Sequence, residues 1–138
     1  MVDFYVNYSA VLVGAIVNMV LGAFWYSPAG FGKKWMKLSG ITMKDIEKAK
    51  PNMNRMYAVT FVGALVMSYV LGHVISFVGA ESVVGGAYVA FWMWLGFAAT
   101  TSLGSAVWGQ KPIGLYFLDN GYWLVALMII GAIHAAWA

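Results

Sequence analysis

The sequence predicts an all-helical, polytopic membrane protein with four transmembrane helices, and three observations lead to this fold class. The 138-residue chain is 62% hydrophobic and only 9% charged, whereas soluble domains carry about 25% charged residues. Four apolar stretches are each close to the roughly 20 residues that a helix needs to cross a bilayer. The basic residues gather in alternate connections between these stretches. We therefore expect lipid to cover most of the surface.

The four spans are expected within a single membrane domain, residues 1–138. No Lys or Arg precedes the first apolar stretch and no small-residue cleavage pattern follows it, so we expect a retained helix rather than a signal peptide. The start of the fourth span is open between Ile113 and Gly121. If Asp119 is the N-cap, the remaining residues span about 27 Å, which just suffices. The expected spans are about 6–26, 56–78, 83–108 and 115–137.

The distribution of basic residues predicts the orientation. Seven of the eight Lys and Arg residues lie between the first two spans, and the eighth, Lys111, lies between the last two. By the positive-inside rule we expect both connections in the cytoplasm and both termini outside a cell membrane. Because the net charge of +3 comes from these segments, it points to the membrane surface and not to nucleic acid.

The connection at residues 29–55 is the only long polar segment. In its first part aromatic and apolar residues alternate with lysines, as in a short helix that lies on anionic headgroups. Thr42 and Asp45 have the spacing of a capping box, which predicts a second short helix ending before Pro51. This connection either only sets the topology or also docks a lipid surface or partner protein. The candidate contacts are Lys33, Lys34, Trp35 and Lys37.

Two similar halves are a further hypothesis. Spans one and three end with Gly, Trp and Pro at similar spacing, and spans two and four each carry a late histidine after a glycine. This pattern is typical of two parallel helical hairpins related by an axis along the membrane normal. Apolar helices rich in Gly and Ala also resemble one another through composition alone.

Small and polar residues recur at helical spacing. Asn18 lies near the middle of span one in a stripe that includes Gly14 and Gly22, and span three carries Thr100 and Thr101. Such stripes allow close packing of helices in lipid. The alternative is that Asn18, Thr100, Thr101 and Asp119 line a polar path across the membrane.

Three ionisable residues are candidates inside or near the membrane. His73 and His134 fall at similar depth, where they are either structural or a pair that relays protons. Two histidines without a third ligand make a poor metal site, so we expect no metal. Asp119 is either an N-cap or ion-pair partner, or a gate for ions.

The residues that are absent narrow the possible functions. The chain has no cysteine, which excludes disulfides and thiolate chemistry. No span carries an acid at mid-depth, in contrast to small exporters built around a central glutamate. No pattern of a nucleophile or a phosphate-binding loop is present, so we assign no catalytic residue and no cofactor. An enzyme is the least supported class.

Several sequence blocks resemble a known family. Trp-Tyr-Ser-Pro at residues 25–28 and Phe-Gly-Lys at residues 31–33 are followed by Trp-Leu-Gly-Phe at 94–97 and Leu-Asp-Asn-Gly-Tyr at 118–122. Over nearly the whole chain, these blocks resemble a prokaryotic family of small membrane proteins, domain of unknown function 1761. The resemblance implies four spans and carries over no catalytic or binding residue.

Three functions remain as hypotheses. The first is a channel or transporter for a small solute or ion, using the polar path. The second is a non-catalytic scaffold or accessory subunit that docks a partner protein through the basic connection. The third, an enzyme, would need a cofactor or lipid beside His73 and His134. For each we expect membrane lipids as partners and association into a homo-oligomer.

Overall fold

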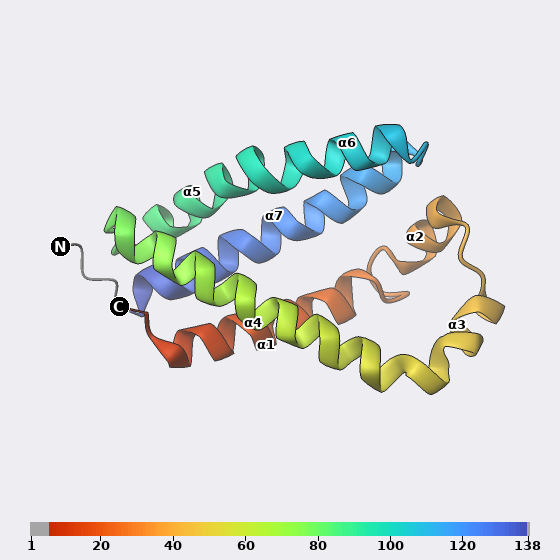
Figure 1. Cartoon of the computed structure of the whole chain (residues 1–138), viewed down its shortest axis with the longest axis horizontal. Coiled ribbons are helices and arrows are strands. Elements are labelled where there is room, and N and C mark those ends of the chain that lie inside the picture. The colour runs from red at the N-terminus through yellow and green to blue at the C-terminus, as the bar shows by residue number, and fades with distance from the viewer. Residues whose placement is uncertain (1–5, 138) are drawn as a thin grey trace.

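The computed structural model describes residues 6–137, which form helices and connections without a strand. Four long helical rods run along the longest axis of the molecule (Figure 1). All four are long and apolar enough to cross a membrane, which confirms the predicted fold class. The rods are α1 (Tyr8–Trp25), α4 (Met53–Val78), the continuous run of α5 (Val83–Met93), η2 (Trp94–Ala99) and α6 (Thr100–Trp108), and α7 (Ile113–Ala136).

Short polar signals define the ends of the rods. Asn7 caps α1, because its Oδ1 accepts hydrogen bonds from the backbone N–H groups of Ser9 and Ala10 at 2.9 and 3.3 Å. Ser82 caps α5 in the same way through the Gly85 N–H. The rod α4 ends at Gly79, whose φ of 80° lies in the left-handed region that favours glycine. The chain therefore reverses between α4 and α5 within a few residues.

The fourth rod begins at the early limit of the range that the sequence left open. Pro112 is the N-cap position and the helix runs from Ile113. Asp119 therefore does not cap the helix and lies about two turns inside it. The 24 residues of α7 span about 36 Å, which is longer than the bilayer core is thick. Asp119 can therefore lie within the span without ending it.

Two short helices connect α1 to α4: α2 (Gly32–Ser39) and α3 (Met43–Ala49), the latter followed by the 3₁₀ turn η1 (Lys50–Asn52). The predicted capping box is confirmed. Asp45 Oδ2 accepts from the Thr42 N–H at 2.9 Å, and Thr42 Oγ1 accepts from the Asp45 N–H at 3.3 Å. These hydrogen bonds to Thr42 hold the pKa of the Asp45 carboxyl below its usual range.

The four rods pack as two hairpins, and α7 has neighbours in both of them. The closest pairs are α1 with α4 and α5 with α7, and α7 also contacts α1 and α4. This arrangement agrees with two hairpin units, while an internal duplication stays a prediction. Figure 1 shows α4 close to α5 near the end of α7 and well apart from α6 at the opposite end.

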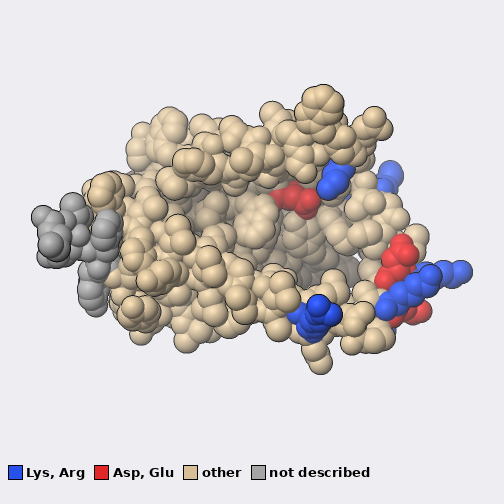
Figure 2. All heavy atoms as spheres, in the orientation of Figure 1, with Lys and Arg blue, Asp and Glu red and all other residues tan. Residues whose placement is uncertain are grey.

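The surface is apolar along the rods and charged at one end. Val20, Val84 and Phe97 have 65%, 78% and 66% of their surface exposed, which water would penalise and lipid does not. On the face drawn in Figure 2, the Lys and Arg side chains gather at the end away from the start of α1 and the finish of α7. We call this the basic end and the opposite one the terminal end. The protein is a multi-pass membrane protein, and its association into oligomers stays a prediction.

A pair of glycines brings α5 and α7 together. A methyl group at Gly131 would lie 2.5 Å from the Gly86 carbonyl oxygen and 2.8 Å from the Ala90 side chain. Real side chains essentially never come this close to a backbone atom. Close approach of this kind is how helices gain packing energy in lipid, where the hydrophobic effect does not drive association.

Gly131→Ala should therefore destabilise the bundle. Overpacking of a tight contact costs about 1–3 kcal/mol. In Gly104→Ala, the matched control, the methyl group meets nothing within 4 Å and should leave stability unchanged or raise it by about 0.5–1 kcal/mol. Unfolding by SDS in mixed micelles, followed by circular dichroism, measures both. Equal stability of the two variants would contradict this packing.

Candidate functional site

The centre of the bundle contains a hydrogen bond between α1 and α7. Asn18 is only 2% exposed, and Tyr122 Oη lies 2.6 Å from its Oδ1 and 2.8 Å from its carbonyl oxygen. The single hydroxyl proton of Tyr122 therefore has two acceptors on Asn18. One turn along α1, Gly22 leaves room for the tyrosine, since a Cβ there would be 3.1 Å from Tyr122 Oη. The Asn18 amide oxygen is thus satisfied without water.

A second tyrosine continues this contact toward the basic end. The Tyr26 ring meets the Tyr122 ring edge to face, with centroids 5.6 Å apart. Tyr26 Oη then donates a 2.7 Å hydrogen bond to Asp119 Oδ1. A carboxylate in or near the membrane requires compensation, and this hydroxyl supplies part of it.

Aromatic side chains also fix the backbone around Asp119. Trp25 Nε1 donates to the Leu118 carbonyl oxygen at 3.2 Å, and Trp94 Nε1 donates to the Asn120 carbonyl oxygen at 3.0 Å. In the opposite direction, from α7 to η2, Tyr116 Oη donates to the Ala99 carbonyl oxygen at 2.7 Å. Ala99 and Trp94 belong to η2, a π-helical turn, and such turns are frequent at functional sites. A π-helical turn leaves backbone carbonyl groups available as acceptors for side-chain donors.

A pocket of about 230 Å³ opens beside Asp119 between α6 and α7. We call it the basic-end pocket. On the face shown in Figure 2, an acidic and a basic group lie side by side in the hollow between the rods. Its lining combines a carboxylate, an amide, an ammonium group, two serine hydroxyls and two aromatic rings: Asp119, Asn120, Lys111, Ser102, Ser105, Tyr116 and Trp123, with Ala106 and Leu115.

A second polar contact lies toward the terminal end. Ser68 Oγ is 3.0 Å from His134 Nε2, and both residues are buried. The His134 ring occupies the space above Gly72, where a Cβ would be 2.6 Å from His134 Cε1. A pocket of about 210 Å³, the terminal-end pocket, has His134 in its lining together with Asn7, Ser76 and Glu81. Nearby, Asn7 Nδ2 donates to the Trp137 carbonyl oxygen at 2.8 Å.

These side chains follow one another along the axis of the bundle. Ser68 lies against Gly14 of α1, and Asn18 is one turn further, about 6 Å along the helix. We call the whole set the interior polar line, and it runs between the two pockets. Its members are His134, Ser68, Asn18, Tyr122, Tyr26 and Asp119.

The structure brings together only part of the polar path expected from the sequence. Asn18 and Asp119 both belong to the interior polar line. Thr100 and Thr101 are exposed, and their hydroxyls donate to the carbonyl oxygens of Gly96 and Phe97 in their own helix. A threonine satisfied in this way can face lipid. The threonines therefore do not line the same route as Asn18.

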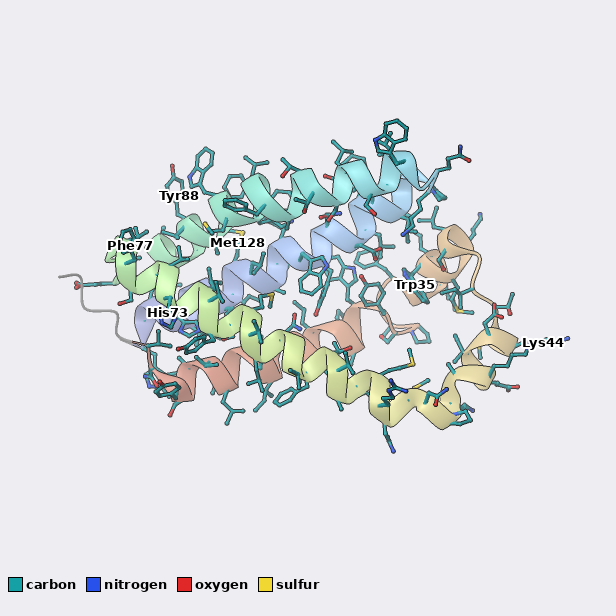
Figure 3. All side chains as sticks on the ribbon, in the orientation of Figure 1. Trp35, Lys44, His73, Phe77, Tyr88 and Met128 are labelled. Atoms are coloured by element: carbon teal, nitrogen blue, oxygen red, sulfur yellow. The ribbon has the colours of Figure 1, made fainter. Side chains whose placement is uncertain are left out.

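The two histidines have different surroundings. His134 is buried against Ser68, whereas His73 is partly exposed and its Nδ1 lies 3.0 Å from the Tyr69 carbonyl oxygen. The rings of His73 and Tyr69 also meet edge to face at 4.4 Å. Figure 3 shows His73 on α4 at the terminal end. Among residues 6–137, no group of three or more His, Asp and Glu side chains could hold a metal ion.

The candidate contacts in α2 divide into two sets. Lys33, Lys34 and Lys37 are exposed. Trp35 is partly buried, and its ring meets the Tyr26 ring at 5.7 Å. Figure 3 shows Trp35 on the side of α2 that faces the long rods. The tryptophan thus anchors α2 to the bundle, while the lysines lie on its exposed surface.

Sequence reasoning missed the two tyrosines and Asn120 as site residues. A signal was present, because Tyr26 follows Asn18 by two turns on one face of a helix and Tyr122 follows Asp119 by three residues. A tyrosine near the end of a span, such as Tyr26, is normally assigned to the membrane interface, and Tyr122 has no sequence signal that links it to Asn18.

The fold and the site define a small polytopic α-helical membrane protein with polar side chains joined by hydrogen bonds in its interior. The chain belongs to the family described as "Protein of unknown function (DUF1761)", whose model matches residues 9–135. This match confirms the resemblance noted in the sequence. No curated protein and no solved structure matches the chain.

Proposed function

We propose that this protein moves a proton or another small ion or solute across the membrane along the interior polar line. The observation that carries the proposal is a series of buried and half-buried hydrogen-bonding side chains between pockets at opposite ends of the bundle. Polar residues are costly inside a membrane and, where they face a bundle interior, often mark ion or proton routes. Helix packing alone would be served by the glycine and alanine contacts.

The packing limits the size of the transported species. At the Ser68–His134 contact, Gly14 and Gly72 have no free space for even a methyl group. Between there and Asn18 the helices remain in close contact, so a large solute would have to separate them. Side chains with exchangeable protons, such as His134, Tyr122 and Tyr26, can instead pass a proton between neighbours. The geometry therefore favours protons and small cations as cargo.

The charge distribution supports an orientation for this route. The basic end carries the lysines of α2 and α3 as well as Lys111, while Glu81 lines the terminal-end pocket. By the positive-inside rule we propose that the basic end faces the cytoplasm and the terminal end faces outside. The pocket with Asp119 then opens on the cytoplasmic side.

Transport can be tested by reconstitution in liposomes that contain a pH-sensitive dye, with separate runs for Na⁺ and K⁺. The wild-type protein should carry at least one of these ions under an imposed gradient. Asn18→Leu should abolish the flux, because it places an apolar side chain at the middle of the line. Tyr122→Phe removes one hydroxyl with little change of shape and should slow the flux about tenfold, equivalent to about 1.4 kcal/mol of barrier.

Thr101→Val is the matched control, because it removes a hydroxyl from the exposed face and should leave the rate unchanged. Circular dichroism and gel filtration establish that each variant is folded. If wild-type liposomes carry protons, Na⁺ and K⁺ no faster than protein-free liposomes, the proposed transport is wrong. Equal rates for Tyr122→Phe and wild type would exclude this route.

The orientation can be tested with single cysteines, because the chain contains none of its own. Lys44 projects from the basic end (Figure 3), and Glu81 lies at the terminal end. In intact cells, a membrane-impermeant maleimide should label Glu81→Cys and should reach Lys44→Cys only after the membrane is opened. The reverse pattern would contradict the proposed orientation.

A scaffold role is the second candidate, and the exposed lysines of α2 favour it. Trp35 fixes this helix against Tyr26, so Lys33, Lys34 and Lys37 are presented on an ordered helix and not on a free linker. Such a row of cations can attract an acidic surface of a partner protein. In this function the interior polar line would only hold the helices together.

The two candidates respond differently to charge reversal. Lys33→Glu, Lys34→Glu and Lys37→Glu together should abolish recovery of a partner in affinity purification, and should leave ion flux unchanged. Lys44→Glu, Lys48→Glu and Lys50→Glu together, in α3 and η1, are the control with the same charge change. Recovery of the same proteins from wild type and the α2 variant would remove the scaffold role.

A further inference from the structure

One residue that lines the basic-end pocket, Asn120, carries a buried acceptor without a donor. Asn120 is 4% exposed, and within residues 6–137 no donor reaches its Oδ1. The Nδ2 group of the same amide donates to the Tyr116 carbonyl oxygen at 3.0 Å. Exchange of the two amide atoms would set the Oδ1 against that carbonyl, so the oxygen is the unpaired atom. A buried acceptor of this kind costs free energy unless a ligand or water supplies a hydrogen.

The neighbouring carboxylate specifies what kind of donor fits. Asp119 precedes Asn120 in α7 and lines the same pocket. One of its oxygens accepts from Tyr26, and a carboxylate has further acceptor capacity on both oxygens. A carboxylate beside an unpaired amide oxygen matches a primary ammonium group, which carries a positive charge and three N–H donors.

The remaining polar groups of the pocket are suited to an anion. Lys111 supplies an ammonium group, and Ser102 and Ser105 supply hydroxyl donors from α6. A phosphate accepts well from both kinds of group. The pocket thus presents acceptors for a cation and donors for an anion, which is the pattern of a zwitterion. Its volume of about 230 Å³ is below that of sites for drug-sized ligands, about 300–1,000 Å³, so the polar part of the ligand is small.

We propose that the basic-end pocket binds a phosphoethanolamine group, with the ammonium at Asn120 and Asp119 and the phosphate near Lys111 and the serines. Phosphatidylethanolamine is the source that fits best. The pocket lies between α6 and α7, and exposed apolar side chains such as Phe97 and Ile129 follow on the two rods toward the terminal end. The acyl chains can lie against this apolar surface while the headgroup enters the pocket. Asp119 is shared with the interior polar line, whereas Asn120 does not belong to it, so variants at Asn120 test this binding separately from transport.

Native mass spectrometry of the detergent-purified protein can test the site with a methylation series of one lipid. Phosphatidylethanolamine, its mono- and dimethyl derivatives and phosphatidylcholine differ in the number of N–H donors. Retention by the wild-type protein should fall along the series, with about a tenfold difference between its ends, because a hydrogen bond to a charged group is lost. Equal retention of all four lipids would overturn the proposal, whatever the behaviour of any variant.

Variants locate the binding in the pocket. Asn120→Leu removes the unpaired oxygen at similar volume and should abolish the preference for phosphatidylethanolamine over phosphatidylcholine. Asn120→Asp keeps an acceptor at this position and should retain the preference. Asn18→Leu, which blocks the proposed ion route, should also retain it, so that failure of transport and failure of lipid binding are distinguishable. Preference that survives in Asn120→Leu would overturn the assignment to this pocket.

Competition with free O-phosphoethanolamine distinguishes the two sources of the headgroup. If the lipid is the ligand, millimolar free compound should displace it poorly, because it lacks the acyl chains that add apolar contact. Displacement at micromolar concentration would instead support the same chemistry from a soluble ligand and overturn the lipid as its source.

Discussion

Lipid supplies no hydrogen bonds, so each polar group that the long helices carry into the membrane needs a partner inside the protein. This constraint explains why α7 occupies the centre. It is the rod with Asp119, Tyr122 and His134 along its length, and a helix with neighbours on several sides can give each of them a partner. These partners come from α1 with its C-cap residue and from α4, since Tyr26 contacts Asp119, Asn18 contacts Tyr122 and Ser68 contacts His134. The other rods take their places around it.

Much of the architecture follows from the sequence because the relevant signals are large and additive. A stretch of some 20 apolar residues and a polar connection with seven cations leave few alternatives for the spans. The capping box of Thr42 and Asp45 was also visible, because it needs only two residues at fixed spacing. The start of α7 was harder to predict. Asp119 and Asn120 look like the polar edge of a span, and their partners Tyr26 and Trp94 are distant in sequence.

The sequence does not predict which individual side chains face the bundle interior and which face lipid. In water an amphipathic helix shows which side is buried, but rods that are apolar all round show no such difference. Thr100 and Thr101 looked like lining residues because they are polar, yet each is satisfied by a carbonyl of its own turn. An asparagine amide can donate to its own helix, but its oxygen finds no free N–H there, and Asn18 lies inside, where its Oδ1 accepts from Tyr122. The distinction depends on whether the helix backbone can satisfy every polar atom of the side chain.

The π-helical turn at η2 has a consequence for the evolution of the pocket. Such a turn accommodates about one residue more than the α-helix around it, so α5 and α6 follow different rotational registers. Side chains on both sides of the turn reach the region of α7. Trp94, at the start of the turn, donates a hydrogen bond to α7, and Ser102 and Ser105, after the turn, line the pocket beside it. Loss of one residue here would turn α6 by about 100° relative to α5 and carry the serines away. The position of these two hydroxyl groups in the cavity therefore depends on the extra residue that the π-helical turn holds.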